Sequence, residues 1–252
     1  MTKREPLLSE PYFDEHIDFI TQAIAEYEEA VRLDPDQFTD LAGVYYALGQ
    51  YRLALFISSY SRGCAVTDLQ QNLHALIATW EMQRQVDTDH VYAVDFKADI
   101  SGYEQALWIL TWGYLLGLGD AALLRLLACV GNAGQDLLFE RLVAQMLPGT
   151  VRKEARKLLY PKVYQPLLAV FDADSIQQPL LLQRFLQQWY DKMRNADWHN
   201  AHLGPDGGGF DGYWCWEAAG VAVAFGLDDT SFQQMPYYPK DLADFARIRL
   251  KS

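Results

Sequence analysis

The residues best suited to chemistry lie together near position 200. Asp197, His199 and His202 stand within Asp197-Trp-His-Asn-Ala-His202, and Asp206 and Asp211 follow. Imidazole and carboxylate groups that meet in one loop can bind a transition metal, which would support metal-dependent hydrolysis. The spacing lacks the i, i+4 histidine pair with a glutamate that metal-binding helices use. We therefore expect the histidines to anchor a loop by hydrogen bonds, and we predict no metal and no cofactor.

Nucleophilic and phosphate-binding sites are no better supported. Cys215 and His199 can be drawn as a thiol–imidazole pair, but Cys215 stands among aromatic residues, where a thiol is usually a small inert hydrophobe. The stretch Gly204-Pro-Asp-Gly-Gly-Gly-Phe-Asp-Gly212 lacks the lysine of a P-loop and lies in an acidic region that repels phosphate. We predict that no residue is catalytic and that the chain is not an enzyme.

Composition indicates a soluble protein with a substantial core. The chain has 252 residues, of which 50% are hydrophobic. Cys64, Cys129 and Cys215 are far apart, which argues against a disulfide framework or a zinc ribbon and fits a reducing compartment. The N-terminus has no signal-peptide apolar region, and the longest apolar run, Ala106 to Leu118, is too short to span a bilayer. We expect a cytoplasmic protein without a membrane partner.

Charge argues against direct nucleic-acid binding and for a basic protein partner. The net charge is −12, whereas phosphate contacts need clustered Lys and Arg. Eight acidic residues stand against Lys240 alone between Asp197 and Ala246. The main basic cluster, which we predict to form one helix face, comprises Arg152, Lys153, Arg156, Lys157 and Lys162.

Helical periodicity dominates the chain. The first predicted helix carries a stripe from Ile17 to Val31 and ends at Pro35. Next, 38–48 and 52–60 are predicted to form a helical hairpin closed at Gly49. Further helices are predicted at 69–80, 103–116, 121–130, 138–146, 152–160, 163–171, 180–193 and 213–225, with a last one after Pro239. The only strand candidate, 90–96, is equally well explained as an extended connector.

These segments predict an all-α fold, a compact bundle of roughly nine to eleven helices. Residues 1–148 would form an N-terminal part and residues 149–252 a C-terminal part, and the two halves would pack together. Residues 195–212 are predicted to form the longest loop, which would supply reach and flexibility. The helix at 213–225 is apolar around most of its circumference, so we expect it to be buried at the centre.

Several residues near the C-terminus have predicted structural roles. Glu217 would be costly if buried alone, and we expect Arg62 to pair with it. Asp229 is expected to cap the turn at 230–233. Pro239 fits the first turn of the last helix, with Asp241 near its positive dipole end, and Tyr237 and Tyr238 would pack that helix onto the core.

The C-terminal segments resemble a known family. Gly212-Tyr-Trp-Cys-Trp-Glu-Ala-Ala-Gly220, Gly226-Leu-Asp-Asp-Thr-Ser-Phe232 and Tyr237-Tyr-Pro-Lys-Asp-Leu242 are similar to the C-terminal part of PoNi-like immunity proteins, and Tyr60-Ser-Arg-Gly63 with Trp80-Glu81 resembles their N-terminal part. We predict structural roles for the signature residues Arg62, Tyr213, Trp216, Glu217, Tyr237, Tyr238, Pro239 and Asp241. The chain departs from the pattern at Lys240, where Tyr is more usual, and at Gly207-Gly-Gly209.

The resemblance implies a cytoplasmic, non-enzymatic immunity protein that neutralises a PoNe-type DNase toxin, often one delivered by a type VI secretion system. Blocking the toxin's active site and binding away from it both fit this function. A helical peptide-binding adaptor is the alternative, because Tyr46-Ala-Leu-Gly-Gln-Tyr-Arg-Leu-Ala-Leu55 is similar to a tetratricopeptide hairpin. A hydrolase using His199, His202 and Asp206 is a third hypothesis.

For the leading hypothesis we predict an interface on acidic surface, because a DNase must be positively charged to hold its substrate. One candidate patch comprises Asp87, Asp89, Asp95 and Asp99, and the other comprises Asp206, Asp211, Asp228 and Asp229. Tyr92, Phe96 and Phe210 are the expected aromatic anchors, exposed in loops between these charges.

Overall fold

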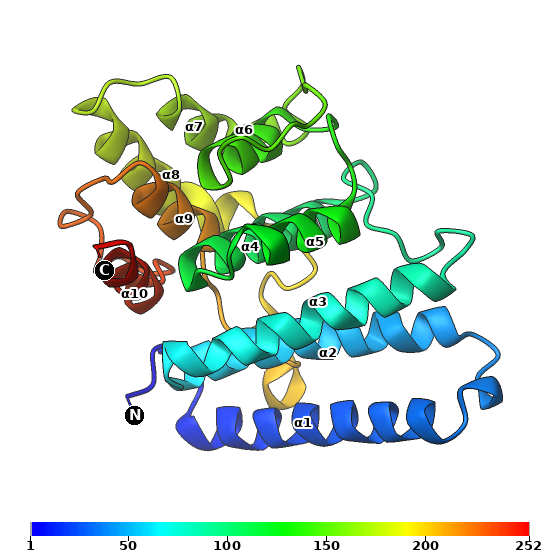
Figure 1. Cartoon of the computed structure of the whole chain (residues 1–252). Coiled ribbons are helices and arrows are strands. Elements are labelled where there is room, and N and C mark those ends of the chain that lie inside the picture. The colour runs from blue at the N-terminus through cyan, green and yellow to red at the C-terminus, as the bar shows by residue number, and fades with distance from the viewer. Residues whose placement is uncertain (1, 252) are drawn as a thin grey trace. The chain divides into compact units, whose positions relative to one another are not determined.

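The computed structural model describes residues 2–251, and all regular elements within them are helical. The α-helices are α1 (Glu10–Leu33), α2 (Leu41–Arg62), α3 (Leu69–Val86), α4 (Ile100–Leu116), α5 (Asp120–Val130), α6 (Leu137–Met146), α7 (Pro161–Val170), α8 (Gln177–Lys192), α9 (Trp216–Ala224) and α10 (Lys240–Lys251) (Figure 1). Short 3-10 helices are η1 (Pro35–Gln37), η2 (Val66–Asp68), η3 (Ala201–Leu203) and η4 (Pro205–Gly207). The all-α prediction is confirmed.

The chain forms two compact units, and each is discontinuous in sequence. The first unit holds the chain up to Ala93 together with Asn200–Tyr213, and the second holds Val94–His199 together with the chain from Trp214 onward. The sequence-based division into residues 1–148 and 149–252 stays a prediction, which separate expression of the two parts would test.

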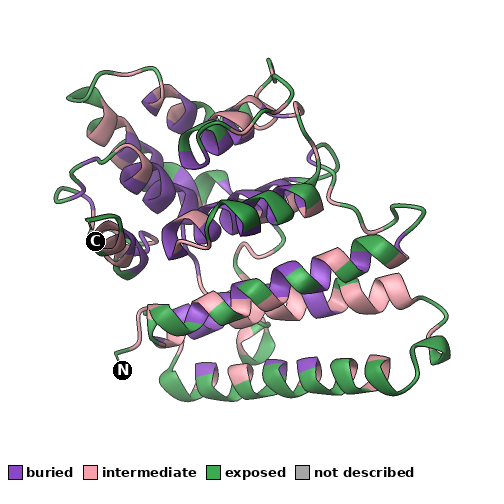
Figure 2. Ribbon diagram, viewed as in Figure 1, coloured by how far each residue is buried: buried purple, intermediate pink, exposed green. Residues whose placement is uncertain are grey.

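The first unit is built on α1, α2 and α3, which lie side by side (Figure 1). The Ser9 side chain caps α1 by accepting the Tyr12 N–H over 3.3 Å, and the helix ends at Leu33, just before Pro35 as predicted. Phe13, Ile20 and Ile24 lie on its buried side, while its other side remains in solvent (Figure 2). A single long amphipathic helix thus covers one side of this unit.

Helix α2 shows that the predicted hairpin at Gly49 is wrong. The helix runs without interruption to Arg62, where Gly63 ends it in the left-handed conformation at φ 101°. A Cβ on Gly49 would lie 2.7 Å from Nε1 of Trp80 on α3, so glycine at this position permits close packing of the two helices. The tetratricopeptide-like turn therefore does not exist, and the adaptor hypothesis loses the motif on which it rested.

The segment Asn200–Tyr213, which makes up most of the loop predicted at 195–212, packs onto α1 and α2 instead of reaching into solvent. The Tyr12 hydroxyl donates to the Phe210 carbonyl over 3.0 Å, and Asp211 accepts a 2.7 Å hydrogen bond from Ser58. Gly207 has φ 85°, and a Cβ there would lie 2.4 Å from the Tyr12 ring. The glycines therefore let this segment fold closely against α1.

The second unit is centred on α4 and α9, whose residues are almost all buried (Figure 2). A Cβ on Gly220 of α9 would lie 2.7 Å from the Thr111 methyl carbon of α4, which allows the two helices to approach closely. Helix α9 starts at Trp216, later than the predicted residue 213. Before it the chain has no regular secondary structure, and the Cys215 N–H bonds to the Tyr237 carbonyl over 2.8 Å. The prediction of a central buried helix is confirmed.

The basic segment 152–160 is not helical, and the predicted basic helix face is wrong. Its backbone instead binds the start of α6: the Leu137 N–H donates to the Lys157 carbonyl over 2.8 Å, and the Leu159 N–H donates to Asp136 over 2.8 Å. Asp136 is fully buried and needs hydrogen-bond donors, which are the N–H groups of Leu159 and Phe139 and the Tyr103 hydroxyl. The hydrogen bond that this segment donates to the buried Asp136 carboxylate thus takes precedence over the helical preference of residues 152–160.

None of the helices described between residues 2 and 251 is long and apolar enough to cross a membrane.

Candidate binding surfaces and the buried signature

Glu217, the acidic residue of the signature, is fully buried in the second unit. Its Oε1 accepts the indole N–H of Trp189 over 2.9 Å. Arg62 instead lies at the surface of the first unit and pairs with Asp14 at 2.6 Å, so the predicted Arg62–Glu217 pair is wrong. Sequence reasoning failed here because a neutral indole donor, which leaves no charge pattern, replaces the expected cation.

A second buried carboxyl lies close to Glu217. Glu104 of α4 is also fully buried, and its Oε2 accepts the indole N–H of Trp198 over 2.7 Å. Burial raises the pKa of Glu217 to about 7. Burial and the nearby Glu217 raise the pKa of Glu104 well above its usual range. Burial therefore favours the protonated form of both carboxyls, and the two indole N–H groups offset only part of that effect.

The other signature residues of the second unit also lie in or beside its core. Trp216 is buried and meets Trp112 edge-on with ring centroids 5.4 Å apart. Tyr237 is half-buried and stacks on Tyr190 at 5.1 Å. Pro239 is buried, and its carbonyl accepts the first hydrogen bond of α10, in which Asp241 occupies the first turn as predicted.

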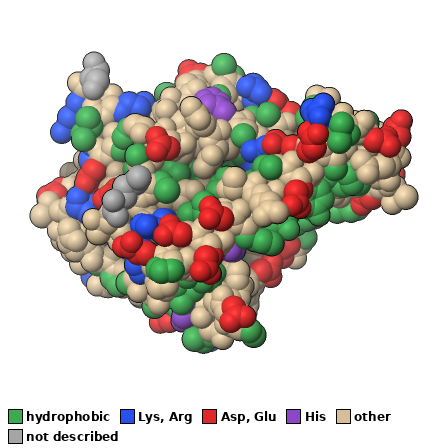
Figure 3. All heavy atoms as spheres, turned by 90° about the horizontal axis from the view of Figure 1, so that it is seen from below, with side chains coloured by type: hydrophobic (Ala, Val, Ile, Leu, Met, Phe, Trp, Pro, Cys, Tyr) green, Lys and Arg blue, Asp and Glu red, His purple; other side chains and the backbone are tan. Residues whose placement is uncertain are grey.

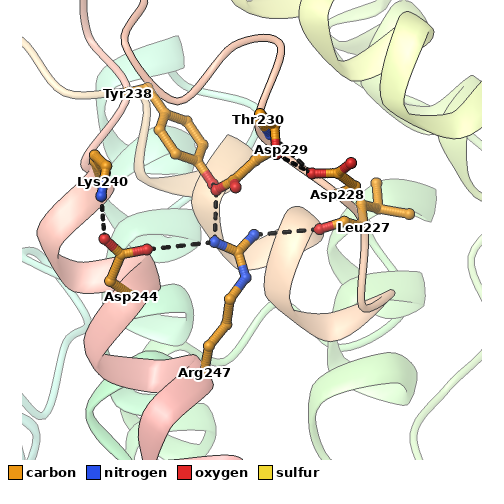
Figure 4. A network of polar contacts seen from close by, with 8 residues as sticks. All are labelled: Leu227, Asp228, Asp229, Thr230, Tyr238, Lys240, Asp244 and Arg247. Carbon is orange, nitrogen blue, oxygen red and sulfur yellow. Dashed lines mark hydrogen bonds and ion pairs between the residues drawn. The ribbon is translucent and has the colours of Figure 1, made fainter.

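Asp229 belongs to a polar network that ties α10 to the turn after α9 (Figure 4). Its Oδ2 accepts 2.7 Å and 2.6 Å bonds from the Tyr238 hydroxyl and the Arg247 guanidinium. Arg247 also donates to the Leu227 carbonyl over 3.3 Å. Only the backbone carbonyl of Asp229 caps the turn at 230–233, through Phe232 and Gln233. The Asp229 carboxylate is therefore buried and hydrogen-bonded within the fold. The number of acidic residues in this part of the sequence did not indicate this.

In the first unit, Tyr213 closes the segment that begins at Asn200. Its buried ring packs on Phe210 with centroids 4.5 Å apart, and its hydroxyl lies 2.8 Å from Nδ1 of His202. Asp211 is half-buried, bonded to Ser58 and paired with His16 at 2.8 Å. The Ser61 hydroxyl donates to the Asp211 carbonyl over 2.6 Å. The Tyr-Ser-Arg-Gly motif of α2 thus helps to anchor this segment.

The predicted acidic patches are only partly available to a partner. Asp87 is buried and accepts the N–H groups of Val91 and Tyr92, each over 2.8 Å. The predicted patch residues whose side chains are exposed are Asp89, Asp95, Asp99, Asp206 and Asp228. Each predicted patch has members in both units.

Two of the three predicted aromatic anchors are not exposed. Phe96 is fully buried and packs edge-on against Phe139 with ring centroids 5.0 Å apart. Phe210, within the segment Asn200–Tyr213, is also buried. Phe96 stands between the charged residues Asp95 and Lys97, and Phe210 follows three glycines, which made both look solvent-exposed in sequence. Tyr92 is half-exposed, stacks on Tyr46 at 5.2 Å and donates its hydroxyl to Asp40. The prediction of exposed rings at Phe96 and Phe210 is therefore wrong.

The residues considered for catalysis have other surroundings. Burial raises the pKa of the Cys215 thiol well above its usual value. His199 stacks on Tyr190 with centroids 4.4 Å apart, whereas His202 bonds to Tyr213. In the described part of the chain, no group of three or more His, Cys, Asp or Glu side chains is arranged to hold a metal ion.

The outer face of α1 is a candidate surface that the sequence analysis missed. The carboxylates exposed there are Glu10, Asp14, Glu15, Asp18, Glu26, Glu28 and Glu29. Phe19 and Leu33 of the same helix are 60% and 66% exposed. In Figure 3, which views the molecule from below Figure 1, acidic side chains are scattered with hydrophobic ones between them. The helical periodicity of these carboxylates was the signal that could have identified this face.

Comparison with known proteins places these features in a family. Residues 4–128 match the model described as PoNe immunity protein (PoNi), N-terminal, and residues 134–242 match PoNe immunity proteins (PoNi), C-terminal. The fold is similar to the crystal structure of protein PA2201 from Pseudomonas aeruginosa, with a TM-score of 0.77 and 21% identity over 98% of this chain and 93% of that one. A search of curated proteins found no match. Since the two models cover most of its length, the chain belongs to the PoNe immunity protein (PoNi) family.

Proposed function

We propose that this protein binds a cognate DNase toxin directly and neutralises it, protecting the producing bacterium and its kin from within the cytoplasm. Delivery of the toxin by a type VI secretion system fits the same proposal. Family membership supports a toxin as the partner. Neutralisation by binding requires neither a cofactor nor a catalytic residue in this chain.

The acidic outer face of α1 is the observation that carries this proposal furthest. Among the exposed carboxylates of this helix, Glu15 and Asp18 have no cation within ion-pair distance in the described structure. A protein that binds DNA must present positive charge, and the field of this face would attract such a surface. The face is thus suited to accelerate association with a nuclease.

Apolar side chains on α1 would contribute affinity in addition to charge. Phe19 is 60% exposed, and its ring meets Tyr51 of α2 edge-on with centroids 6.5 Å apart. A groove of about 530 Å³ is lined further along the helix by Ala25, Ala30 and Leu33. Interfaces commonly derive most of their binding energy from a few such apolar anchors, surrounded by a polar rim. We propose Phe19 as the first such anchor.

The exposed members of the predicted patches remain candidates for further contacts. They are Asp89, Tyr92, Asp95 and Asp99 in the central connector, and Asp206 and Asp228 near the C-terminal segments. Asp87, Phe96, Phe210 and Asp229 have buried side chains, and we propose that they support the fold.

The proposal is tested by co-expression with the nuclease-like domain encoded by a neighbouring reading frame. We expect survival of the host and intact genomic DNA when both proteins are made, and loss of both when this protein is omitted. An unrelated DNase toxin serves as the specificity control and should remain lethal. Degraded DNA despite abundant folded immunity protein would refute the proposal for that toxin.

A further inference from the structure

A groove of about 740 Å³ lies in the second unit, and Asp99 of the predicted connector patch is among its lining residues. It lies between the start of α7, the start of α4 and the end of α8, with Pro161, Ile100 and Lys192 on its three walls. A smaller pocket of about 160 Å³ shares Lys162 and Val163 with it and extends along the α7–α8 pair. Together they form a groove that we name the α7–α8 groove.

The rim of the α7–α8 groove is cationic although the protein is strongly acidic. Lys162, Lys192 and Arg194 are all exposed there. Within residues 2–251, none of the three lies within ion-pair distance of a carboxylate; Arg194 donates only to the Asp191 carbonyl, over 3.2 Å. Asp99, the carboxylate among the lining residues, accepts the Gly102 N–H over 2.7 Å as the cap of α4. Three cations thus remain available to an external anion.

The start of α7 adds to this positive field. Pro161 is the first residue of the helix, and the preceding Tyr160 provides no side-chain cap. An uncapped helix N-terminus attracts negative charge within its first turn. The helix dipole and the three side chains therefore act in the same direction.

The floor of the groove is apolar. Ile100 and Val163 are buried beneath it, and Phe185 and Trp189 line the smaller pocket. Isolated phosphate would leave this surface uncovered, whereas a peptide with carboxylates flanked by Leu or Phe would satisfy both the rim and the floor.

We propose that the α7–α8 groove binds an acidic, apolar-flanked peptide segment of the toxin. This inference rests on the proposed function, and it adds a contact of opposite charge to the acidic face of α1. Complementary charge of both signs would fix the orientation of a complex and exclude partners with uniformly basic surfaces.

The first arm of the test measures toxin binding by surface plasmon resonance. Lys162→Glu/Lys192→Glu reverses two of the three rim charges, and Arg156→Glu/Lys157→Glu makes the same change in net charge at exposed cations outside the groove. We expect the groove variant to bind at least tenfold more weakly, mainly through faster dissociation, while the control stays within twofold of wild type. Equal affinities for the two variants, with matched thermal melts, would overturn the proposal.

The second arm uses no toxin, so it tests peptide binding by the groove independently of the proposed function. Methyl NMR of Ile100 and Val163 is recorded with the peptide acetyl-Glu-Leu-Asp-Phe-Glu-Leu-amide, with its Gln/Asn counterpart, with inorganic phosphate and with a single-stranded oligonucleotide. We expect saturable shifts with the acidic peptide, lost in the groove variant. Shifts with phosphate or the oligonucleotide but not with the acidic peptide would reject a peptide site. If wild type fails to bind the toxin while the acidic peptide still shifts these methyls, the toxin assignment fails and the groove chemistry stands.

Discussion

Trp189 donates its indole N–H to the carboxyl of Glu217 over 2.9 Å, within a core where both side chains are buried. This bond joins α8 to α9, the helix that carries the most distinctive part of the sequence signature. It satisfies one oxygen of Glu217 without supplying a positive charge. The stability of this core therefore depends on keeping Glu217 protonated.

The first prediction concerns pH. Glu217 has a pKa of about 7 when folded and about 4.5 when unfolded, so between these values the folded state binds the extra proton. The free energy of unfolding should therefore fall as pH rises from 4.5 to 7, by about 3 kcal/mol from this group. Glu104, whose pKa is raised in the same direction, should extend the decline to higher pH.

Urea titrations at a series of pH values measure this slope. Glu217→Gln mimics the protonated carboxyl, and we expect it to flatten the slope and to raise stability at pH 8. Glu15→Gln, at an exposed site on α1, should keep the wild-type slope. A slope that is the same in all three proteins would show that Glu217 ionises normally in the fold.

The second prediction concerns Tyr213. Replacing it with Ala should destabilise the protein by about 2–4 kcal/mol, because a buried ring is lost from its packing against Phe210. Tyr213→Phe should cost only about 1 kcal/mol, because it keeps the buried ring and removes the hydroxyl that contacts His202. Unchanged melting temperatures in both variants would instead make Tyr213 a surface contact, with neutralisation lost at full stability.

The third prediction separates Asp229 from its neighbour. Asp229→Asn weakens the charged bonds to Tyr238 and Arg247 and should cost about 1–3 kcal/mol. Asp228 is exposed and accepts the Thr230 N–H over 3.0 Å, a bond that the Asn side-chain oxygen can keep, so Asp228→Asn should cost less than about 1 kcal/mol. Denaturant unfolding compares the two variants. If the two losses are equal, the bonds from Tyr238 and Arg247 to Asp229 in Figure 4 do not stabilise α10 as described.

Local patterns predicted most of the helices because their signals lie within a few residues. The predicted stripe from Ile17 to Val31 lies within α1, which ends just before Pro35 as predicted. The helix predicted at 103–116 ends with α4 at Leu116, where Gly117 takes the left-handed conformation at φ 72°. The predicted secondary structure was wrong where contacts with residues distant in sequence determine the local conformation. Gly49 looks like a helix end in sequence but serves close packing with Trp80, and residues 152–160 leave the helix to satisfy buried Asp136.

The candidate binding surfaces were harder to predict than the fold because exposure is a property of the tertiary structure. Phe210 follows three glycines and would be exposed in a free loop, yet the Tyr12 hydroxyl holds its carbonyl over 3.0 Å and the ring is buried. Asp229 is next to Asp228 in sequence, but only Asp229 faces Arg247. Charge counts cannot separate such neighbours, and only the fold shows which carboxylates remain at the surface.

The fourth prediction tests charge steering by α1. Glu15→Lys/Asp18→Lys/Glu26→Lys should slow association with the toxin several-fold at low salt and much less at high salt, because exposed charges are screened over a few ångströms there. Asp89→Lys/Asp95→Lys/Asp99→Lys makes the same change in net charge on the predicted connector patch. Stopped-flow mixing should show the larger effect for α1. Association rates that no patch alters at any ionic strength would exclude steering by these surfaces.

Titration of purified DNase toxin with this protein tests the central claim most directly, with DNA cleavage as the readout. Inhibition by binding predicts a linear loss of cleavage that ends at one equivalent. It also predicts the same endpoint when His199, His202 and Cys215 are replaced together by Asn, Asn and Ser, because inhibition by binding involves no catalytic turnover. Complete protection far below one equivalent, lost in the triple variant, would show catalytic inactivation and contradict neutralisation by binding.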